Sequence, residues 1–103
     1  MNRRDALVRV IDALHSEIEA LRANDVAALE RATAGKLSAI DVLQSLGDGP
    51  ADQELRGLAE EADRLNDTCR IYVNLMAANV RRRLQILTGD GGNAYGRAGM
   101  AFA

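Results

Sequence analysis

The chain has 103 residues, of which 48% are apolar but only 3% aromatic, and its formal net charge at pH 7 is -2. This length suits a single domain with one modest core, built here from Leu, Ala, Val and Ile. The near-neutral balance of charge gives no overall positive field, which argues against nucleic acid as a partner. We therefore expect protein partners.

The first residues alternate apolar and charged side chains after Arg3 and Arg4, whereas a secretory signal requires an unbroken apolar run. The only cysteine, Cys69, excludes an internal disulfide and fits a reducing compartment. No apolar run approaches the roughly 18 residues that span a bilayer. We expect a soluble, cytoplasmic protein with no membrane insertion.

The first predicted helical region covers about residues 3–46, with apolar residues spaced by three and four. Asn24 and Asp25 are good N-caps, so the helix either continues through residues 22–26 or ends there and a new one begins. We favour the continuous helix, because neither Pro nor Gly interrupts that stretch. The apolar positions are Leu7, Ile11, Leu14, Ile18, Leu21, Val26, Leu29, Ala32, Leu37, Ile40, Leu43 and Leu46.

The sequence Gly47-Asp48-Gly49-Pro50 predicts a turn, and Asp52 is placed to cap a second helix over about residues 52–88. At 1.5 Å per residue this helix would span roughly 54 Å, against roughly 66 Å for an unbroken first helix. The two lengths are close enough to pair. The second apolar stripe runs through Leu55, Leu58, Ala62, Leu65, Cys69, Tyr72, Val73, Met76, Val80, Leu84 and Leu87.

The predicted fold is all-α with coiled-coil-like packing: a long antiparallel helical hairpin, or an up-down-up three-helix bundle if the first helix breaks. The helical domain covers residues 1–88. A lone hairpin leaves apolar surface exposed, which favours a weak homo-oligomer or a partner helix bound along the groove.

Residues 89–103 form a predicted flexible tail, because they hold five of the nine glycines of the chain. The tail also holds Tyr95 and Phe102, two of the three aromatic residues. Aromatic side chains in such a segment are typical of a contact with a partner. The alternative is a frayed terminus whose aromatic residues have no role.

A set of short motifs runs along nearly the whole chain, together with an acidic, leucine-rich first region with the Asn-Asp interruption, a glycine turn and a Gly-rich end. The motifs are Lys36-Leu37, Ile40, Leu43, Leu65-Asn66, Leu87-Thr88-Gly89 and Tyr95-Gly96-Arg97-Ala98-Gly99. In these features the chain resembles FlgN-type flagellar export chaperones. Two departures are the short chain and the residues after Asn66, where a second asparagine is expected soon afterwards.

The resemblance implies an ATP-independent cytoplasmic chaperone without a cofactor. Such a protein holds FlgK- and FlgL-like hook-associated proteins by their helical C-terminal regions, prevents their premature assembly, and docks on the export gate protein FlhA. Tyr95 is then the expected contact with the gate, and Met100 and Phe102 extend that contact or touch the client. The candidate client-binding residues are Leu65, Tyr72, Val73, Met76, Val80 and Leu84, some of which belong to the core.

The other candidate residues favour ordinary structural roles. A lone histidine, His15, cannot form a metal cluster, and Cys69 on an apolar face is an inert packing residue. Asn66 and Asn79 are either buried residues that fix helix register, which we favour for Asn66, or solvated positions. The cations of Arg81-Arg82-Arg83 complement the dipole at a helix C-terminus, and stacking aromatics for nucleic acid are missing.

The sequence contains no nucleophile with a base, no paired carboxylates and no metal-ligand spacing, so nothing in it indicates an enzyme. The alternative function is a coiled-coil adaptor or a self-assembling structural helical protein. A small DNA-associated regulator is a third class, which predicts a salt-dependent interaction with duplex DNA.

Overall fold

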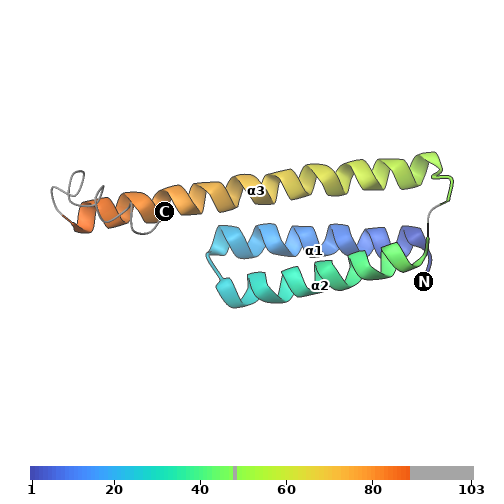
Figure 1. Ribbon diagram of the computed structural model, residues 1–103, viewed down its shortest axis with the longest axis horizontal. Coiled ribbons are helices and arrows are strands. Elements are labelled where there is room, and N and C mark those ends of the chain that lie inside the picture. Colours follow the sequence, from blue (N-terminus) through green and yellow to red (C-terminus); the bar gives the residue numbers. More distant parts are fainter. Residues whose placement is uncertain (48, 89–103) are drawn as a thin grey trace. The chain divides into compact units, whose positions relative to one another are not determined.

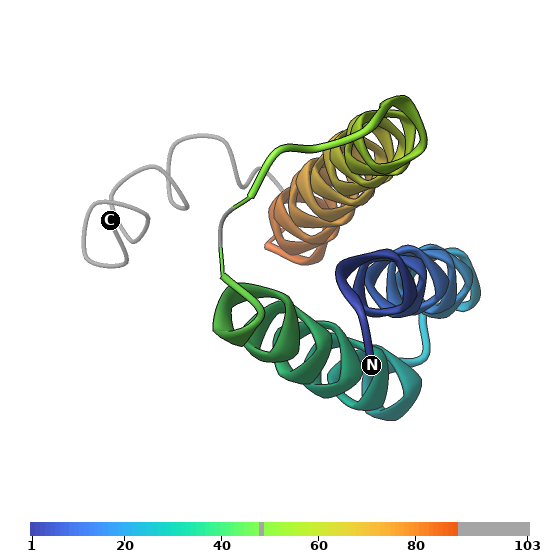
Figure 2. The ribbon, with the colours of Figure 1, turned by 90° about the vertical axis from the view of Figure 1, so that its right-hand side faces the viewer.

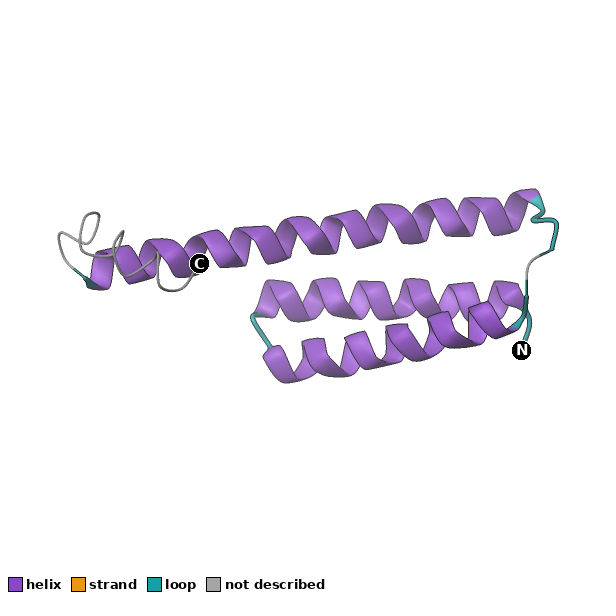
Figure 3. Cartoon of the chain, viewed as in Figure 1, coloured by secondary structure: helices purple, strands orange, loops and turns teal. Residues whose placement is uncertain are grey.

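A computed structural model describes residues 1–47 and 49–88, and within them every regular element is a helix. The three helices are α1 (Arg3–Ala23), α2 (Val26–Ser45) and α3 (Gln53–Leu87) (Figures 1 and 3). The all-α prediction is confirmed. The chain divides into two units, residues 1–72 and residues 73–103, and the boundary falls within the continuous helix α3.

The first helical region is broken, so the preference for a continuous helix is wrong and the three-helix alternative is confirmed. Asn24 ends α1 in the left-handed conformation, with φ 55° and ψ 40°. The carboxylate of Asp25 then accepts a hydrogen bond of 3.0 Å from the backbone N–H of Ala28 and so caps α2. Asparagine tolerates the left-handed region better than most residues, which explains why the turn needs no glycine.

The turn between α2 and α3 lies where the glycines predict it. Gly47 has φ +80°, a value that favours glycine, and it follows directly after the C-cap of α2 at Leu46. Asp52 caps α3 as predicted, since its carboxylate accepts a hydrogen bond of 2.7 Å from the backbone N–H of Leu55.

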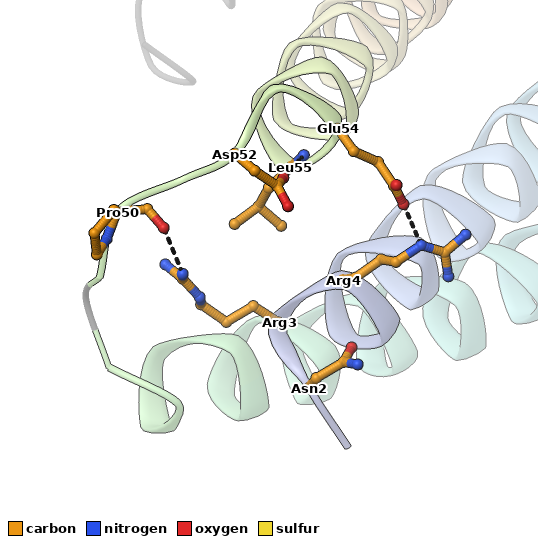
Figure 4. Close-up of a pocket in the computed structure, with 7 residues that line it drawn as sticks. All are labelled: Asn2, Arg3, Arg4, Pro50, Asp52, Glu54 and Leu55. Carbon is orange, nitrogen blue, oxygen red and sulfur yellow. Dashed lines mark hydrogen bonds and ion pairs between the residues drawn. The ribbon is translucent and has the colours of Figure 1, made fainter.

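Two arginines at the start of α1 hold this turn and the start of α3 (Figure 4). The guanidinium of Arg3 donates hydrogen bonds of 3.0 Å to the carbonyl oxygen of Gly49 and 2.9 Å to that of Pro50. Arg4 forms an ion pair with Glu54 in the first turn of α3. Both side chains of this pair are exposed, so its main effect is to position the two helix ends rather than to add much stability.

In residues 1–72 the three helices run up, down and up. The start of α1 meets the start of α3 at the Arg4–Glu54 pair, and further along Leu14 and Glu17 meet Cys69, so α1 and this part of α3 are parallel. α1 and α2 lie side by side and antiparallel, as the two views of the ribbon agree (Figures 1 and 2).

The core of residues 1–72 is built mainly from α1. Its buried residues cover about half of the helix circumference at 100° per residue, which a helix needs when it packs against two neighbours. Leu14 is its largest fully buried side chain, at 2% exposure. Outside α1 only Ala39 and Cys69 are buried among the described residues. The buried residues of α1 are Ala6, Leu7, Val10, Ile11, Leu14, Glu17, Ala20 and Leu21.

Candidate functional site

Exposed apolar side chains are concentrated in the second half of α3. Of the eleven large hydrophobic residues that are exposed in the described part of the chain, seven lie between residues 71 and 87. A helix surface of this kind, in a protein with a separate core elsewhere, marks an interaction site. It is the leading candidate functional site.

Five of these side chains form one stripe along α3, here called the exposed stripe: Val73, Met76, Val80, Leu84 and Leu87. Their spacings of three, four, four and three place them within an arc of about 80° on the helix. Val80 is 55% exposed and Leu87 is 81% exposed, while Met76 is partly buried. Leu55, Leu58 and Leu65, which are all partly buried in residues 1–72, lie on the same face of α3.

The six candidate client-binding residues therefore fall into two groups. Leu65 and Tyr72 are partly buried within residues 1–72, where they belong to the packed part of α3. The other four, Val73, Met76, Val80 and Leu84, are members of the exposed stripe. The tail candidates Tyr95, Met100 and Phe102 lie outside the described residues.

Three further exposed apolar residues of α3 were not predicted. Ile71, Leu75 and Ile86 are 57%, 58% and 68% exposed and fall on the side of the helix opposite the stripe. Ile71 and Leu75 are four residues apart and Ile86 follows eleven residues later, so the three share a second side of the helix, which a search for one amphipathic face ignores. Their signal in the sequence is that residues 71–87 are apolar on two sides, whereas a surface helix is usually apolar on one.

Residues 1–72 contain a groove between α2 and the first part of α3, with α1 as its floor. One part has a volume of about 440 Å³ and lies over Val10 and Leu14, and the adjoining part has a volume of about 360 Å³ and lies over Leu7. The small side chain of Ala59 lines both parts. The remaining apolar lining consists of Leu37, Ile40, Leu43, Ala51, Leu55 and Ala62.

A buried polar cluster joins the three helices of residues 1–72. The carboxylate of Glu17 is 5% exposed, accepts a hydrogen bond of 2.6 Å from the Thr33 hydroxyl, and lies 3.1 Å from the Lys36 ammonium. The Cys69 thiol lies 3.8 Å from the same carboxylate. Because a shift in register would leave the buried Glu17 charge without its partners, this cluster fixes the register of the helices.

The role favoured for Asn66 is wrong, whereas the packing position predicted for Cys69 is confirmed. Asn66 is exposed beside the groove, so it does not fix the register from the core. Cys69 is buried and free, as expected for a packing residue. Burial raises the pKa of its thiol, the Glu17 carboxylate raises it further, and Lys36 opposes the shift. A thiol with a raised pKa is a poor nucleophile at neutral pH.

The described residues offer no cluster of three or more histidine, cysteine or carboxylate side chains that could hold a metal ion. His15 is exposed on α1. None of the three described helices has an apolar stretch of the length and hydropathy that crossing a bilayer requires. No protein-family model, curated protein or solved structure matches this chain. The chemistry of the exposed stripe is that of a docking surface for another apolar helix face.

Proposed function

We propose that this protein is an export chaperone of the FlgN type, which binds hook-associated proteins in the cytoplasm and delivers them to the flagellar type III export gate. One observation carries the proposal: the apolar face of α3 continues beyond Tyr72 as the exposed stripe. A face that packs against helices in residues 1–72 and stays exposed in residues 73–87 suits the capture of a further helix. The resemblance in the sequence supplies the identity of the client.

The size of the stripe suits a chaperone that must release its client. Residues 73–87 would lie along a partner helix for roughly 22 Å, at 1.5 Å per residue. Completing the burial of the five side chains of the stripe would contribute on the order of 1 kcal/mol each on average. That total of about 5 kcal/mol is comparable with the cost of association, so the stripe alone supports modest affinity.

The clients are FlgK- and FlgL-like proteins, which present helical C-terminal regions with an apolar face needed later for assembly. Covering that face on the stripe prevents premature polymerisation, because the same surface cannot pair twice. The second partner is FlhA, and Tyr95 in the tail is its proposed contact, while Met100 and Phe102 extend that contact or touch the client. No cofactor takes part in this cycle of capture and release.

Co-purification with a C-terminal fragment of a FlgK-like hook-associated protein tests the proposal. We expect the full chain to bind, and the double variant Val80→Asp/Leu84→Asp to bind at least about tenfold more weakly, which is roughly 1.4 kcal/mol. Asn74→Asp/Gln85→Asp is the matched control, because it adds the same two charges to α3 at exposed positions outside the stripe. This control should bind like the wild type.

Two results would overturn the proposal. The first is the absence of a complex between the full chain and hook-associated fragments. The second is a tight homo-oligomer that the stripe variant dissolves, which would favour the coiled-coil adaptor or self-assembling protein. A separate variant, Tyr95→Ala, should keep the client complex and lose binding to FlhA, since its position in the tail is distinct from the stripe.

A further inference from the structure

The charge of the chain is divided unevenly along its length. Residues 1–72 hold nine lysine and arginine side chains against fourteen aspartate and glutamate side chains. Residues 73–88 hold Arg81, Arg82 and Arg83 and no acidic residue at all. Among the described residues no carboxylate forms an ion pair with these three arginines. The segment of α3 that bears the exposed stripe is therefore cationic, whereas the chain as a whole is acidic.

The arginines are distributed around the stripe in a defined way. At 100° per residue, Arg83 lies about 60° from the middle of the stripe on one side, and Arg81 lies about 100° from it on the other. Arg82 lies about 160° away, on the side of Ile71, Leu75 and Ile86. Two of the three cations thus border the apolar surface, in the positions from which flanking residues of a helix pair contact the partner.

We infer that the exposed stripe binds an amphipathic helix whose apolar face is bordered by carboxylates. This inference rests on the proposed function for the presence of a helix on the stripe, and it adds the chemistry that selects the helix. Glutamate or aspartate at the flanks of the partner would pair with Arg81 and Arg83, and lysine there would meet like charge. Flanking charges set partner choice in helix pairs.

Charge complementarity also decides against a second copy of this chain as the occupant. Pairing two stripes, parallel or antiparallel about Val80, would bring together Arg81 and Arg83 of both copies, which are four cations, without a carboxylate from either segment. Repulsion of this kind disfavours the pair, in the same way that like charges at flanking positions disfavour coiled-coil partners. The stripe is thus suited to a heterologous partner.

An anionic membrane is the other cation-seeking surface, and the distribution of side chains on α3 argues against it. A helix that lies on a membrane has a strongly polar face opposite its apolar face. Opposite the stripe, α3 instead carries Ile71, Leu75 and Ile86, which are exposed. The stripe also continues the face that packs against helices in residues 1–72, so another helix is the better fit.

Three synthetic amphipathic peptides of about five helical turns test the inference. They share one leucine seam and differ only at the flanking positions, which are all glutamate, all glutamine or all lysine. Binding to the full chain is measured by fluorescence anisotropy at low and moderate salt. We expect the glutamate peptide to bind about tenfold or more tightly than the lysine peptide, and the difference to shrink as salt screens the pairs.

Charge-reversal variants of the arginines show which of them produce the preference for the glutamate peptide. Arg83→Glu should weaken the glutamate peptide about fivefold or more, whereas Arg82→Glu, the same charge change on the far side of the helix, should stay within about twofold. The double variant Arg81→Glu/Arg83→Glu should prefer the lysine peptide. Because these positions are exposed, the helical circular dichroism of each variant should match that of the wild type.

Several outcomes would overturn the inference: equal binding of the three peptides, equal losses for Arg82→Glu and Arg83→Glu, or self-association of the wild type that Val80→Asp/Leu84→Asp abolishes. Binding to phosphatidylserine-containing vesicles without any peptide preference would also overturn it. Failure here is distinguishable from failure of the proposed function. A hook-associated fragment that binds the wild type and Arg81→Glu/Arg83→Glu equally contradicts only the charge rule, whereas peptide selectivity without a hook-associated complex contradicts only the client.

Discussion

The two halves of α3 share one apolar face but differ in what covers it. In residues 53–72 the face is partly or fully buried, most deeply at Cys69, which is 8% exposed. In residues 73–87 the same face is the exposed stripe, where Val80 is 55% exposed. Apolar spacing therefore predicts which side of a helix can be buried, whereas burial itself depends on the neighbouring helices.

The polar residues beside each half differ in a corresponding way. In residues 1–72 a buried cluster of Glu17, Thr33 and Lys36 ties the packed helices to one register. Residues 73–88 carry Arg81 and Arg83 at the borders of the stripe, with no acidic residue in that segment. The packed half of α3 lies beside charges that are already paired with one another, whereas the exposed half carries arginines that can pair with a partner. The following predictions test this division.

The largest loss of stability is expected in the core of residues 1–72. Leu14→Ala removes a side chain that is only 2% exposed and should lower the free energy of unfolding by about 3 kcal/mol, because a cavity adds to the lost burial. Leu87→Ala is the control in the stripe, at 81% exposure, and should change it by less than about 0.5 kcal/mol. Urea titration measures both. Similar losses for the two variants would contradict the division.

The buried cluster should give the next largest effect. Lys36→Met leaves the Glu17 carboxylate buried without its cation and should cost about 2 kcal/mol, less than for a fully buried pair because Lys36 is partly exposed. Arg31→Met, an exposed arginine on the same helix, is the control and should be nearly neutral. Glu17→Met/Lys36→Met should recover most of the loss. A loss equal to that of Arg31→Met would show that the cluster does not fix the helices.

A smaller effect is expected at the break between α1 and α2. Asp25→Ala removes the acceptor for the Ala28 N–H and should cost about 1 kcal/mol in urea titrations, while Asp25→Asn should retain most of the cap. An increase in helical circular dichroism together with an increase in stability would mean that the variant joins α1 to α2. That outcome would contradict the three-helix arrangement.

Much of this fold is predictable from local signals, and the exceptions have physical reasons. Asp52, Gly47 and the apolar spacing correctly predict the helical regions and the second turn. At Asn24 the choice between a continuous and a broken helix depends on whether α2 gains more by packing on α1 than it loses by turning. That balance is tertiary, and local propensity does not contain it.

The candidate site shows the same limit. The spacing of three and four places Val73, Met76, Val80 and Leu84 on one face of α3. It places Leu65 and Tyr72 on the same face, although these two side chains are partly buried in residues 1–72. Sequence spacing cannot separate the two groups, because both follow one period on one helix. Glu17 and Lys36 lie on different helices, nineteen residues apart, so their pairing depends on the turn at Asn24.

Val80→Cys in the full chain should cause the smallest change in stability. It should also locate most sharply the boundary between the packed and the exposed half of α3. The substitution lies in the exposed stripe and should alter the free energy of unfolding by less than about 0.5 kcal/mol. Alkylation at neutral pH, followed by peptide mass, should modify the introduced thiol quickly and Cys69 slowly. Burial covers the sulfur of Cys69 and raises the pKa of its thiol, so little reactive thiolate forms.

Burial of the sulfur and the raised pKa of the thiol both slow the alkylation of Cys69, and the pH dependence of alkylation separates these two causes. Raising the pH towards 9 should speed alkylation of the introduced thiol until its thiolate population saturates, whereas Cys69, whose pKa is raised in the folded state, should stay slower and continue to gain rate at higher pH. Stability also falls as the pH rises, because the thiol of Cys69 loses its proton at a lower pH in the unfolded chain than in the folded chain. The contribution of this thiol to stability is complete below its pKa in the unfolded chain and is lost as the pH rises through its pKa in the folded chain. Equal labelling rates at both positions would mean that the face of α3 is as exposed at Cys69 as it is at Val80, and the boundary drawn between the two halves of the helix would be wrong.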